Sequence, residues 1–289
     1  MNNGKGLVDV RALVRKVYKG WVPGFLLSGL EKLVHQDELN ELMLLQDYVD
    51  GVDLSNRLLE RLDISVDIVG CDRLPKEGER VLFASNHPLG GADGIVLTAV
   101  LGSLAGKNFH VMVNELLMQV WQMADVFVPL NEYGAQSRKG HHNLTEALEG
   151  EAQMLTFPAG AVSRKAEGGL IRDREWRPSF AKLAKRYERD IIPLYFEGSN
   201  SKGFYRIEDF RAKIGIKLNV GTILLPGEFL GAKGKHFTIY VGERIPFDTV
   251  PDGPDVKAFS SRVRSLVYTL PEAYASEERT PFLPVLPKD

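Results

Sequence analysis

The chain has little cysteine, no long apolar run and almost no net charge. Its 289 residues include a single cysteine, Cys71, which excludes an internal disulfide and a cysteine-based zinc site and fits a reducing cytoplasm. No stretch reaches the ~18 apolar residues of a membrane-spanning helix, and the first residues show no secretory pattern. The formal net charge of -2 provides no global basic field, so we expect no nucleic-acid partner.

The first 63 residues differ in pattern from the rest. Leucine recurs at helical spacing through residues 31–63, and turns are indicated at Pro23-Gly24 and at Gly51, so residues 1–63 are predicted to form an N-terminal helical segment. An apolar group at residues 21–30 follows several basic residues, which suits an interfacial segment on an anionic membrane. A helical cap on the main domain is the alternative. The basic residues are Lys5, Arg11, Arg15, Lys16 and Lys19.

Short apolar strands alternate with amphipathic helices from Ile64 to the C-terminus. This alternation predicts an α/β domain over residues 64–289, with a largely parallel, mixed central sheet flanked by helices. The tail 281–289 contains three prolines and is expected to be a loose strap. The expected strands are 64–69, 80–84, 109–113, 126–129, 153–157, 190–196, 218–225 and 236–241. The expected helices are 93–105, 115–124, 141–149, 175–189, 205–213 and 256–269.

The densest group of reactive side chains is SNHPLGGADG, residues 85–94, directly after an apolar strand. Pro88 favours an extended backbone at His87, and the glycine pair permits a tight reversal. Asp93 then stands where the next helix begins and can fold back onto the His87 ring. A carboxylate on one ring nitrogen fixes the tautomer and leaves the other nitrogen as a base for a hydroxyl or amine nucleophile.

Each of these residues also has a simpler interpretation. His87 can be a packed histidine, Asp93 a helix N-cap, and the glycine pair only a turn. Their combination at a strand end favours a site, because open α/β sheets bind ligands at the carboxyl ends of their strands. His141-His142 has no spaced partner for zinc and is interpreted as a solvated helix start, so no metal is expected.

Several blocks resemble the glycerolipid (1-acylglycerol-3-phosphate) acyltransferase superfamily over residues 64–245. Asn86-His87 followed by Asp93 is similar to its first block, with five intervening residues instead of four. FPAGAVS at 157–163 is similar to its third block, Phe-Pro-Glu-Gly-Thr-Arg-Ser; IIPL at 191–194 and YVGERIP at 240–246 resemble the fourth block and the closing strand. The segments NHPLGGADG, FPAGAVSRK and YFEGSNS resemble a bacterial branch of acyltransferases labelled hemolysin-like. Some members of this branch are linked to aminolipids.

The resemblance implies an O-acyltransferase that moves a fatty acyl chain from an acyl carrier protein or coenzyme A thioester to a hydroxyl of a polar lipid precursor. His87 would be the base and Asp93 would orient it. Backbone N–H groups around Gly90-Gly91 or around Phe157–Gly160 would hold the oxyanion, and the sequence leaves both open. No cofactor besides the acyl thioester is implied. The implied substrate-binding residues are Asn86, Gly90, Gly91, Phe157, Pro158, Gly160 and Arg164.

Two departures from the superfamily concern the acceptor. Ala159 and Val162 stand where the third block carries a Glu and an Arg that help to hold glycerol phosphate, and residues 127–131 lack the Arg of the second block. Arg164, two positions beyond Val162, would face the same side of an extended segment and can pair bidentately with a carboxylate. We therefore expect a carboxylate-bearing, hydroxylated acceptor. The other nearby cations are Arg138, Lys139 and Lys165.

Three alternatives stay open. The first is a lysophosphatidic acid acyltransferase of phospholipid synthesis. The second is a thioesterase, although the chain lacks a Gly-x-Ser-x-Gly elbow. The third is a non-catalytic lipid- or acyl-carrier-binding module, against which His87 and Asp93 argue. A lipid product and the basic N-terminus together predict a cytoplasmic protein that is peripheral on the inner face of the cytoplasmic membrane.

Overall fold

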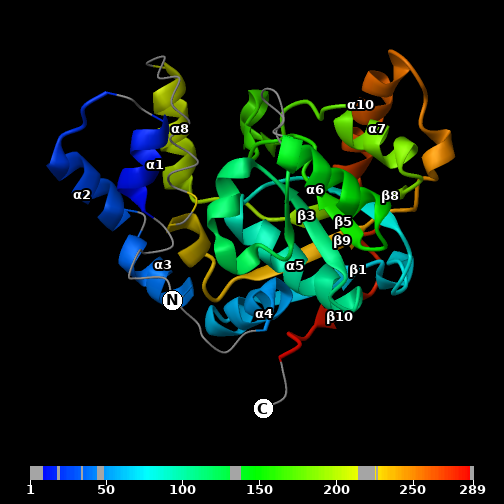
Figure 1. The fold of residues 1–289 in the computed structure, drawn as a ribbon, viewed down its shortest axis with the longest axis horizontal. Coiled ribbons are helices and arrows are strands. Elements are labelled where there is room, and N and C mark those ends of the chain that lie inside the picture. The colour runs from blue at the N-terminus through cyan, green and yellow to red at the C-terminus, as the bar shows by residue number, and fades with distance from the viewer. Residues whose placement is uncertain are drawn as a thin grey trace.

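The computed structural model describes residues 9–17, 20–33, 35–43, 49–130, 138–213, 225 and 227–286. Its centre is an eight-stranded sheet of order β10-β1-β9-β8-β2-β5-β3-β4, with helices on both faces (Figure 1). The strands are β1 (Ser65–Val69), β2 (Val81–Ser85), β3 (Phe109–Val113), β4 (Phe127–Pro129), β5 (Gln153–Thr156), β8 (Asp190–Glu197), β9 (His236–Val241) and β10 (Arg279–Phe282).

The sheet is mixed but largely parallel, as the sequence predicts. Strands β4, β3, β5, β2 and β8 run parallel to one another. The direction reverses at β9, which pairs antiparallel with β8 and parallel with β1. Edge strand β10 pairs antiparallel with β1. The parallel part carries the site, because the carboxyl ends of its strands meet at one edge.

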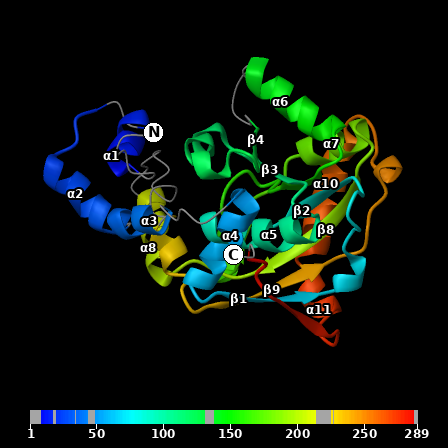
Figure 2. The ribbon, with the colours of Figure 1, turned by 60° about the horizontal axis from the view of Figure 1, so that its bottom comes forward.

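Side chains of β2 alternate between two apolar layers. Val81 and Phe83 join a core with helices α4 (Gly51–Arg61) and α5 (Gly91–Leu104). Leu82 and Ala84 join a core on the opposite face (Figure 2). The helices of that face are α6 (Arg138–Glu149), α7 (Ser179–Arg186) and α10 (Asp255–Val267). Short helix α11 (Leu270–Ala273) follows α10. Both faces of β2 are therefore buried, which explains its continuous apolar sequence.

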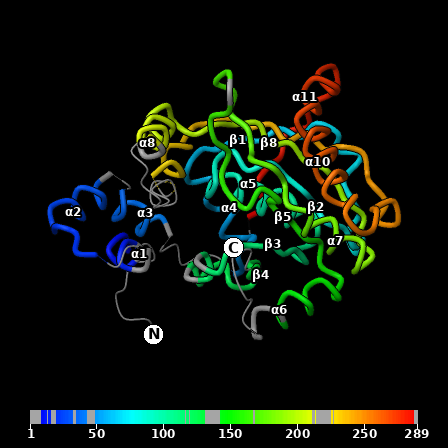
Figure 3. The backbone as a smooth tube through the Cα atoms, turned by 90° about the horizontal axis from the view of Figure 1, so that it is seen from above, coloured from blue at the N-terminus to red at the C-terminus, as the bar shows by residue number. Residues whose placement is uncertain are grey.

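The N-terminal helices α1 (Val10–Val17), α2 (Gly24–Leu33) and α3 (Gln36–Met43) lie to one side of the sheet, beside α8 (Lys202–Lys213) (Figure 3). Residues of α1, α2 and α8 share a separate apolar cluster, whereas the leucines of α4 pack into the main core. The members of the separate cluster include Val10, Val14, Leu27, Val162, Phe204 and Tyr205.

Some expected elements differ from those observed. The helix expected at 115–124 is wrong: two 3₁₀ helices, Glu115–Gln119 and Trp121–Met123, occupy it, since Val120 has a non-helical backbone. The tail is not wholly loose, because Pro281 lies in β10, where an edge strand tolerates the missing N–H. The expected strand 218–225 lies outside the described residues, except for Leu225, which is helical.

A two-stranded hairpin near the site has no counterpart in the expected elements. Strands β6 (Arg164–Lys165) and β7 (Ile171–Arg172) pair antiparallel, with Arg164 opposite Arg172. Each strand has two residues, too few to show a period-two pattern. Downstream, α7 is shorter than the 175–189 expected because it starts only after Pro178.

Candidate active site

The site lies at the carboxyl edge of the parallel strands. Strand β2 is hydrogen-bonded to β5 on one side and to β8 on the other, all in the same direction. His87 therefore follows β2 at the edge where Phe157 follows β5 and Asn200 follows β8. Three loops distant in sequence converge there, at the position where open α/β sheets hold their ligands.

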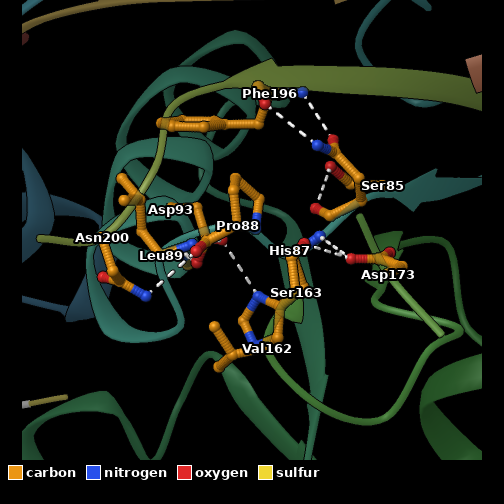
Figure 4. A network of polar contacts seen from close by, with 12 residues as sticks. Ser85, His87, Pro88, Leu89, Asp93, Val162, Ser163, Asp173, Phe196 and Asn200 are labelled. Atoms are coloured by element: carbon orange, nitrogen blue, oxygen red, sulfur yellow. Dashed lines mark hydrogen bonds and ion pairs between the residues drawn. The ribbon is translucent and has the colours of Figure 1, made fainter. Parts of the chain in front are cut away.

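His87 and Asp93 form the predicted pair (Figure 4). Nδ1 of His87 lies 3.1 Å from Oδ2 of Asp93, so the contact is made across the five intervening residues. The Asp93 side chain is fully buried, whereas the His87 side chain is 17% exposed. An ionised carboxylate only accepts, so Nδ1 carries the proton and Nε2 keeps its lone pair. Nε2 points toward the side chain of Val162 (Figure 4).

The neighbouring charges set the basicity of His87. Burial acts to lower the pKa of His87, but the charge and hydrogen bond of Asp93 outweigh it, and the pKa lies above its ordinary value of 6.5. Asp173 adds to this increase and Arg164 opposes it. The His87 ring is therefore a stronger base than a free imidazole. At pH 7 a smaller fraction of it is neutral than of a free imidazole.

The turn between the pair depends on Gly90. Its φ of +78° suits glycine, and an added Cβ would lie 2.7 Å from the side chain of Leu225 and 2.9 Å from that of Val162. Asp93 closes the turn by accepting hydrogen bonds from the N–H groups of Leu89 (2.9 Å) and Gly94 (2.8 Å). These bonds hold the carboxylate in one orientation toward the ring.

Helix α5 begins at this turn with Gly91, after an N-cap at Gly90 that has no side-chain cap. Within the described part of the chain, the N–H groups of Gly90 and Gly91 have no hydrogen-bond acceptor. Gly91 is exposed. Unpaired N–H groups at a helix N-terminus attract negative charge, which makes them suitable oxyanion donors.

The loop after β5 packs directly on the histidine. The Phe157 ring stacks on the His87 ring with centroids 4.0 Å apart, and Ser163 donates its N–H to the His87 carbonyl at 2.8 Å. Pro158 is buried, and its carbonyl accepts from the N–H of Arg177. Gly160 donates its N–H to the Phe157 carbonyl at 2.9 Å. The Gly160 N–H is therefore engaged within its own loop, whereas those of Gly90 and Gly91 are available as donors.

Two asparagines connect the loop between β2 and α5, residues 86–90, to strand β8 and to the segment after it. This loop carries His87 and is called the histidine loop below. Asn86 is buried, and its amide exchanges hydrogen bonds with the main chain of Phe196, at 3.0 Å as donor and 2.6 Å as acceptor. Asn200 donates from Nδ2 to the carbonyl of Pro88 at 3.1 Å. Asn86 is thus engaged with main chain where the sequence predicts a substrate contact, and Asn200 is a second anchor that the sequence reasoning missed.

Arg164 lies on hairpin strand β6, adjacent to Ser163. Its Nε donates to Glu208 at 3.1 Å, and Nη1 donates to the carbonyls of Val162 and Ser163. Its guanidinium also lies over the ring of Phe204, 5.2 Å from the centroid. These contacts hold Arg164 close enough to His87 for its charge to lower the pKa of the ring.

A second carboxylate, Asp173, also contacts the histidine loop and was not foreseen from the sequence. Its Oδ1 accepts from the main-chain N–H of His87 at 3.2 Å and from the hydroxyl of Ser163 at 2.5 Å. Asp93 and Asp173 approach His87 from opposite sides (Figure 4). Among the described residues, no group of three or more acidic, histidine or cysteine side chains is arranged to hold a metal ion.

The family follows from a family-model match that covers nearly the whole chain. The sequence model of a family described as Acyltransferase matches residues 11–275. The chain belongs to the acyltransferase family. It is 36% identical over 268 residues to a lyso-glycine lipid O-acyltransferase of Phocaeicola vulgatus, covering 91% of this chain and 95% of that protein. It is 37% identical over 270 residues to the protein of the same name from Bacteroides thetaiotaomicron, covering 91% and 97%.

The acyltransferase is also similar to a solved structure, the 1-acyl-sn-glycerophosphate acyltransferase of Thermotoga maritima. The TM-score is 0.48 and the identity 15%, with 90% of this chain and 91% of that chain covered. Within the described residues, no helix is long and apolar enough to cross a bilayer.

Proposed function

We propose that this acyltransferase transfers a fatty acyl group from an acyl carrier protein or coenzyme A thioester to the hydroxyl of a lyso-glycine lipid or a closely similar N-acyl amino acid. The observation that carries the proposal is the His87–Asp93 pair at the carboxyl edge of β2, with a buried carboxylate and a partly exposed ring. Two relatives that align over nearly their whole length are named for lyso-glycine lipid O-acylation.

The reaction follows from the free nitrogen of His87. Nε2 takes the proton of the acceptor hydroxyl as its oxygen attacks the thioester carbon. The carbonyl oxygen becomes an oxyanion, which the N–H groups of Gly90 and Gly91 at the start of α5 stabilise. When the intermediate collapses, the carbon–sulfur bond breaks, and the leaving thiolate takes the proton from the imidazolium. The products are the O-acylated lipid and a free thiol, and His87 is neutral again.

The residues around Nε2 favour an acceptor without a phosphomonoester. Val162, an apolar side chain, lies beside Nε2, where the superfamily carries an arginine that helps to hold phosphate (Figure 4). The nearest cationic feature is the hairpin, on which Arg164 stands directly opposite Arg172. Arg164 already pairs with Glu208, but the two guanidinium groups together carry more positive charge than that one carboxylate balances. One carboxylate of an N-acyl amino acid supplies the second negative charge.

The experiment supplies purified enzyme with an acyl thioester and either the lyso-glycine lipid or lysophosphatidic acid, and identifies the products by mass spectrometry. We expect O-acylated glycine lipid, with lysophosphatidic acid a much poorer acceptor. Parallel reactions with acyl carrier protein and coenzyme A thioesters identify the donor. Efficient acylation of lysophosphatidic acid with no turnover of the lyso-glycine lipid would refute the proposed acceptor.

We also propose that the enzyme is peripheral on an anionic membrane through the α2 side. Trp21 and Phe25 are 84% and 75% exposed, and Leu26 is also exposed. Arg15 is exposed nearby in sequence, whereas Arg11 is already paired with Glu31. Exposed aromatic residues next to basic ones are typical of interfacial segments. Lys5 and Lys19, which the sequence hypothesis also invokes, lie outside the described residues.

Vesicle flotation tests this surface. The double variant Trp21→Ser/Phe25→Ser should lose binding to anionic vesicles, whereas Leu283→Ser, which removes an equally exposed apolar side chain near the C-terminus, should not. Replacing Arg15 with Gln should weaken binding mainly at low salt, because exposed charges are screened at high salt. Equal binding by the double variant and the wild type would show that another surface meets the bilayer.

A further inference from the structure

Asp173 follows strand β7 and is 2% exposed, and both carboxylate oxygens and both main-chain polar atoms of the residue have hydrogen-bond partners. Oδ1 accepts from the His87 N–H and the Ser163 hydroxyl, and Oδ2 accepts from Nε1 of Trp176 at 2.8 Å. Its own N–H contacts the Tyr268 hydroxyl at 2.7 Å, and Arg264 donates to its carbonyl. Asp173 therefore joins the histidine loop, the loop after β5 and helix α10.

The His87 main chain is held on both of its polar atoms by this arrangement. Its N–H donates to Asp173, and its carbonyl accepts from the N–H of Ser163, which also donates its hydroxyl to Asp173. Asp93, in contrast, contacts the ring itself. One carboxylate thus orients the imidazole, and the other fixes the backbone from which the imidazole projects.

A carboxylate so deeply buried is costly unless its charge has a use. Burial outweighs the hydrogen bonds from Ser163 and Trp176 and the proximity of His87, so the pKa of Asp173 lies above its ordinary value. A neutral residue with the same shape would fill the place without this cost. In its ionised form Asp173 raises the pKa of His87 and so stabilises the protonated ring during proton transfer.

We infer that Asp173 is a positioning residue of the acyl transfer reaction, which fixes the His87 main chain and supplies a second negative charge to the imidazolium. The inference rests on the proposed function only for its kinetic test. The titrating or charged groups facing His87 are Asp93 from α5, Arg164 from β6 and Asp173 itself. Those facing Asp173 are His87, Tyr268 and Arg264.

The first test needs no substrate. The imidazole signal of His87 is assigned by comparison with His87→Ala, and its pH titration is followed by NMR in the wild type and in Asp173→Asn. The amide oxygen can still accept from Ser163 and the His87 N–H, but the charge is gone and the Trp176 N–H loses its acceptor, so we expect a lower His87 pKa. Asp53→Asn is the matched control, since Asp53, in α4, is equally buried but pairs with Lys107. An unchanged His87 pKa in Asp173→Asn would overturn the electrostatic role.

The second test separates positioning from binding. Loss of a charged hydrogen bond on the base should lower kcat about tenfold to hundredfold while the acceptor KM stays within about twofold. Asp53→Asn should leave both constants unchanged. An equal kcat for Asp173→Asn and the wild type, or a loss confined to KM, would contradict the positioning role.

Ser163→Ala keeps the proposal testable if Asp173→Asn does not fold. It removes the hydroxyl that holds Asp173 against the histidine loop but leaves the carboxylate, so kcat should fall several-fold at unchanged KM. Wild-type kcat in Ser163→Ala would contradict the proposed coupling. If the wild type acylates neither acceptor, the proposed function fails, but the NMR titration still decides the role of Asp173.

Discussion

Strands β2 and β8 have a buried charge at each end, and the two charges have different surroundings. At the amino end, Arg189 precedes β8 and is fully buried. Its guanidinium donates to the carbonyls of Ala147, Leu148 and Gly150 at the end of α6, and to those of Ala152 and Val81. Burial lowers the pKa of Arg189 to about 10, so it stays protonated at neutral pH.

At the carboxyl end of the same strands, the partners are themselves titratable. His87 faces Asp93 through its ring and Asp173 through its main chain. Peptide carbonyls cannot take up a proton at ordinary pH, whereas imidazole and carboxylate groups can. The amino end therefore uses a fixed charge to hold α6 against the sheet, whereas we propose that the carboxyl end uses exchangeable protons for chemistry.

The comparison predicts that substitutions at the carboxyl end lower activity with little effect on stability. Substitutions at the amino end should lower stability with little effect on activity. Replacing His87 with Ala removes the base and should lower kcat about 10²- to 10⁴-fold. The unfolding free energy should change by no more than about 1 kcal/mol, because the ring is partly exposed. Steady-state kinetics and urea unfolding measure both. His142→Ala, on the exposed surface of α6, is the matched control and should change neither. Substantial residual activity in His87→Ala would contradict the assignment of the chemistry to the carboxyl end.

Asp93→Asn should have the next largest effect. The amide keeps the shape, but it no longer holds the proton on Nδ1, so kcat should fall by about two to three orders of magnitude. Because Asp93 raises the pKa of His87, its loss should also move the acidic limb of the pH–rate profile to lower pH. A limb that stays at its wild-type position would show that Asp93 does not set the basicity of His87.

Arg189→Met tests the amino end. It leaves the carbonyls of the α6 terminus buried without a donor and should lower the unfolding free energy by about 3–5 kcal/mol. Activity per folded molecule should not change. Urea unfolding and active-site-normalised kinetics give the two values, and Arg189→Lys, which keeps the charge with fewer donors, should fall between wild type and Met. A loss of kcat in Arg189→Met without a loss of stability would contradict the purely structural role of the amino end.

Arg164→Ala should have the smallest effect. Removing one guanidinium from the hairpin should raise the acceptor KM about tenfold, as expected for one charged hydrogen bond, and leave the donor KM nearly unchanged. Because Arg164 lowers the pKa of His87, its removal should move the acidic limb to higher pH. Equal increases in both KM values would show that Arg164 supports the loop rather than the acceptor.

Much of the sheet could be predicted because its strands are buried on both faces. The apolar runs of β2, β3 and β8 lie within a residue of their expected bounds. Two helix predictions differ from the structure because of local backbone geometry. The helix expected at 115–124 is interrupted at Val120, and α7 starts only after Pro178. Neither interruption changes the apolar pattern from which the helices were predicted.

The site was predictable where it is local. His87 and Asp93 are six residues apart, on either side of a glycine turn, so the sequence itself indicates their contact. Asp173 is 86 residues from His87 and reaches it through a hairpin too short to give a pattern. Asn200 is likewise 112 residues from Pro88. Contacts of this range depend on the strand order, which the sequence does not reveal.

The most direct test of His87 as the base compares two pKa values in the wild-type enzyme. The acidic limb of kcat/KM reports the essential base of the free enzyme, and NMR titration reports the His87 ring. The account predicts that activity rises with pH as the ring loses its proton, and that both midpoints coincide above 6.5. A kinetic midpoint clearly separated from the His87 titration, or activity independent of pH across it, would contradict His87 as the base.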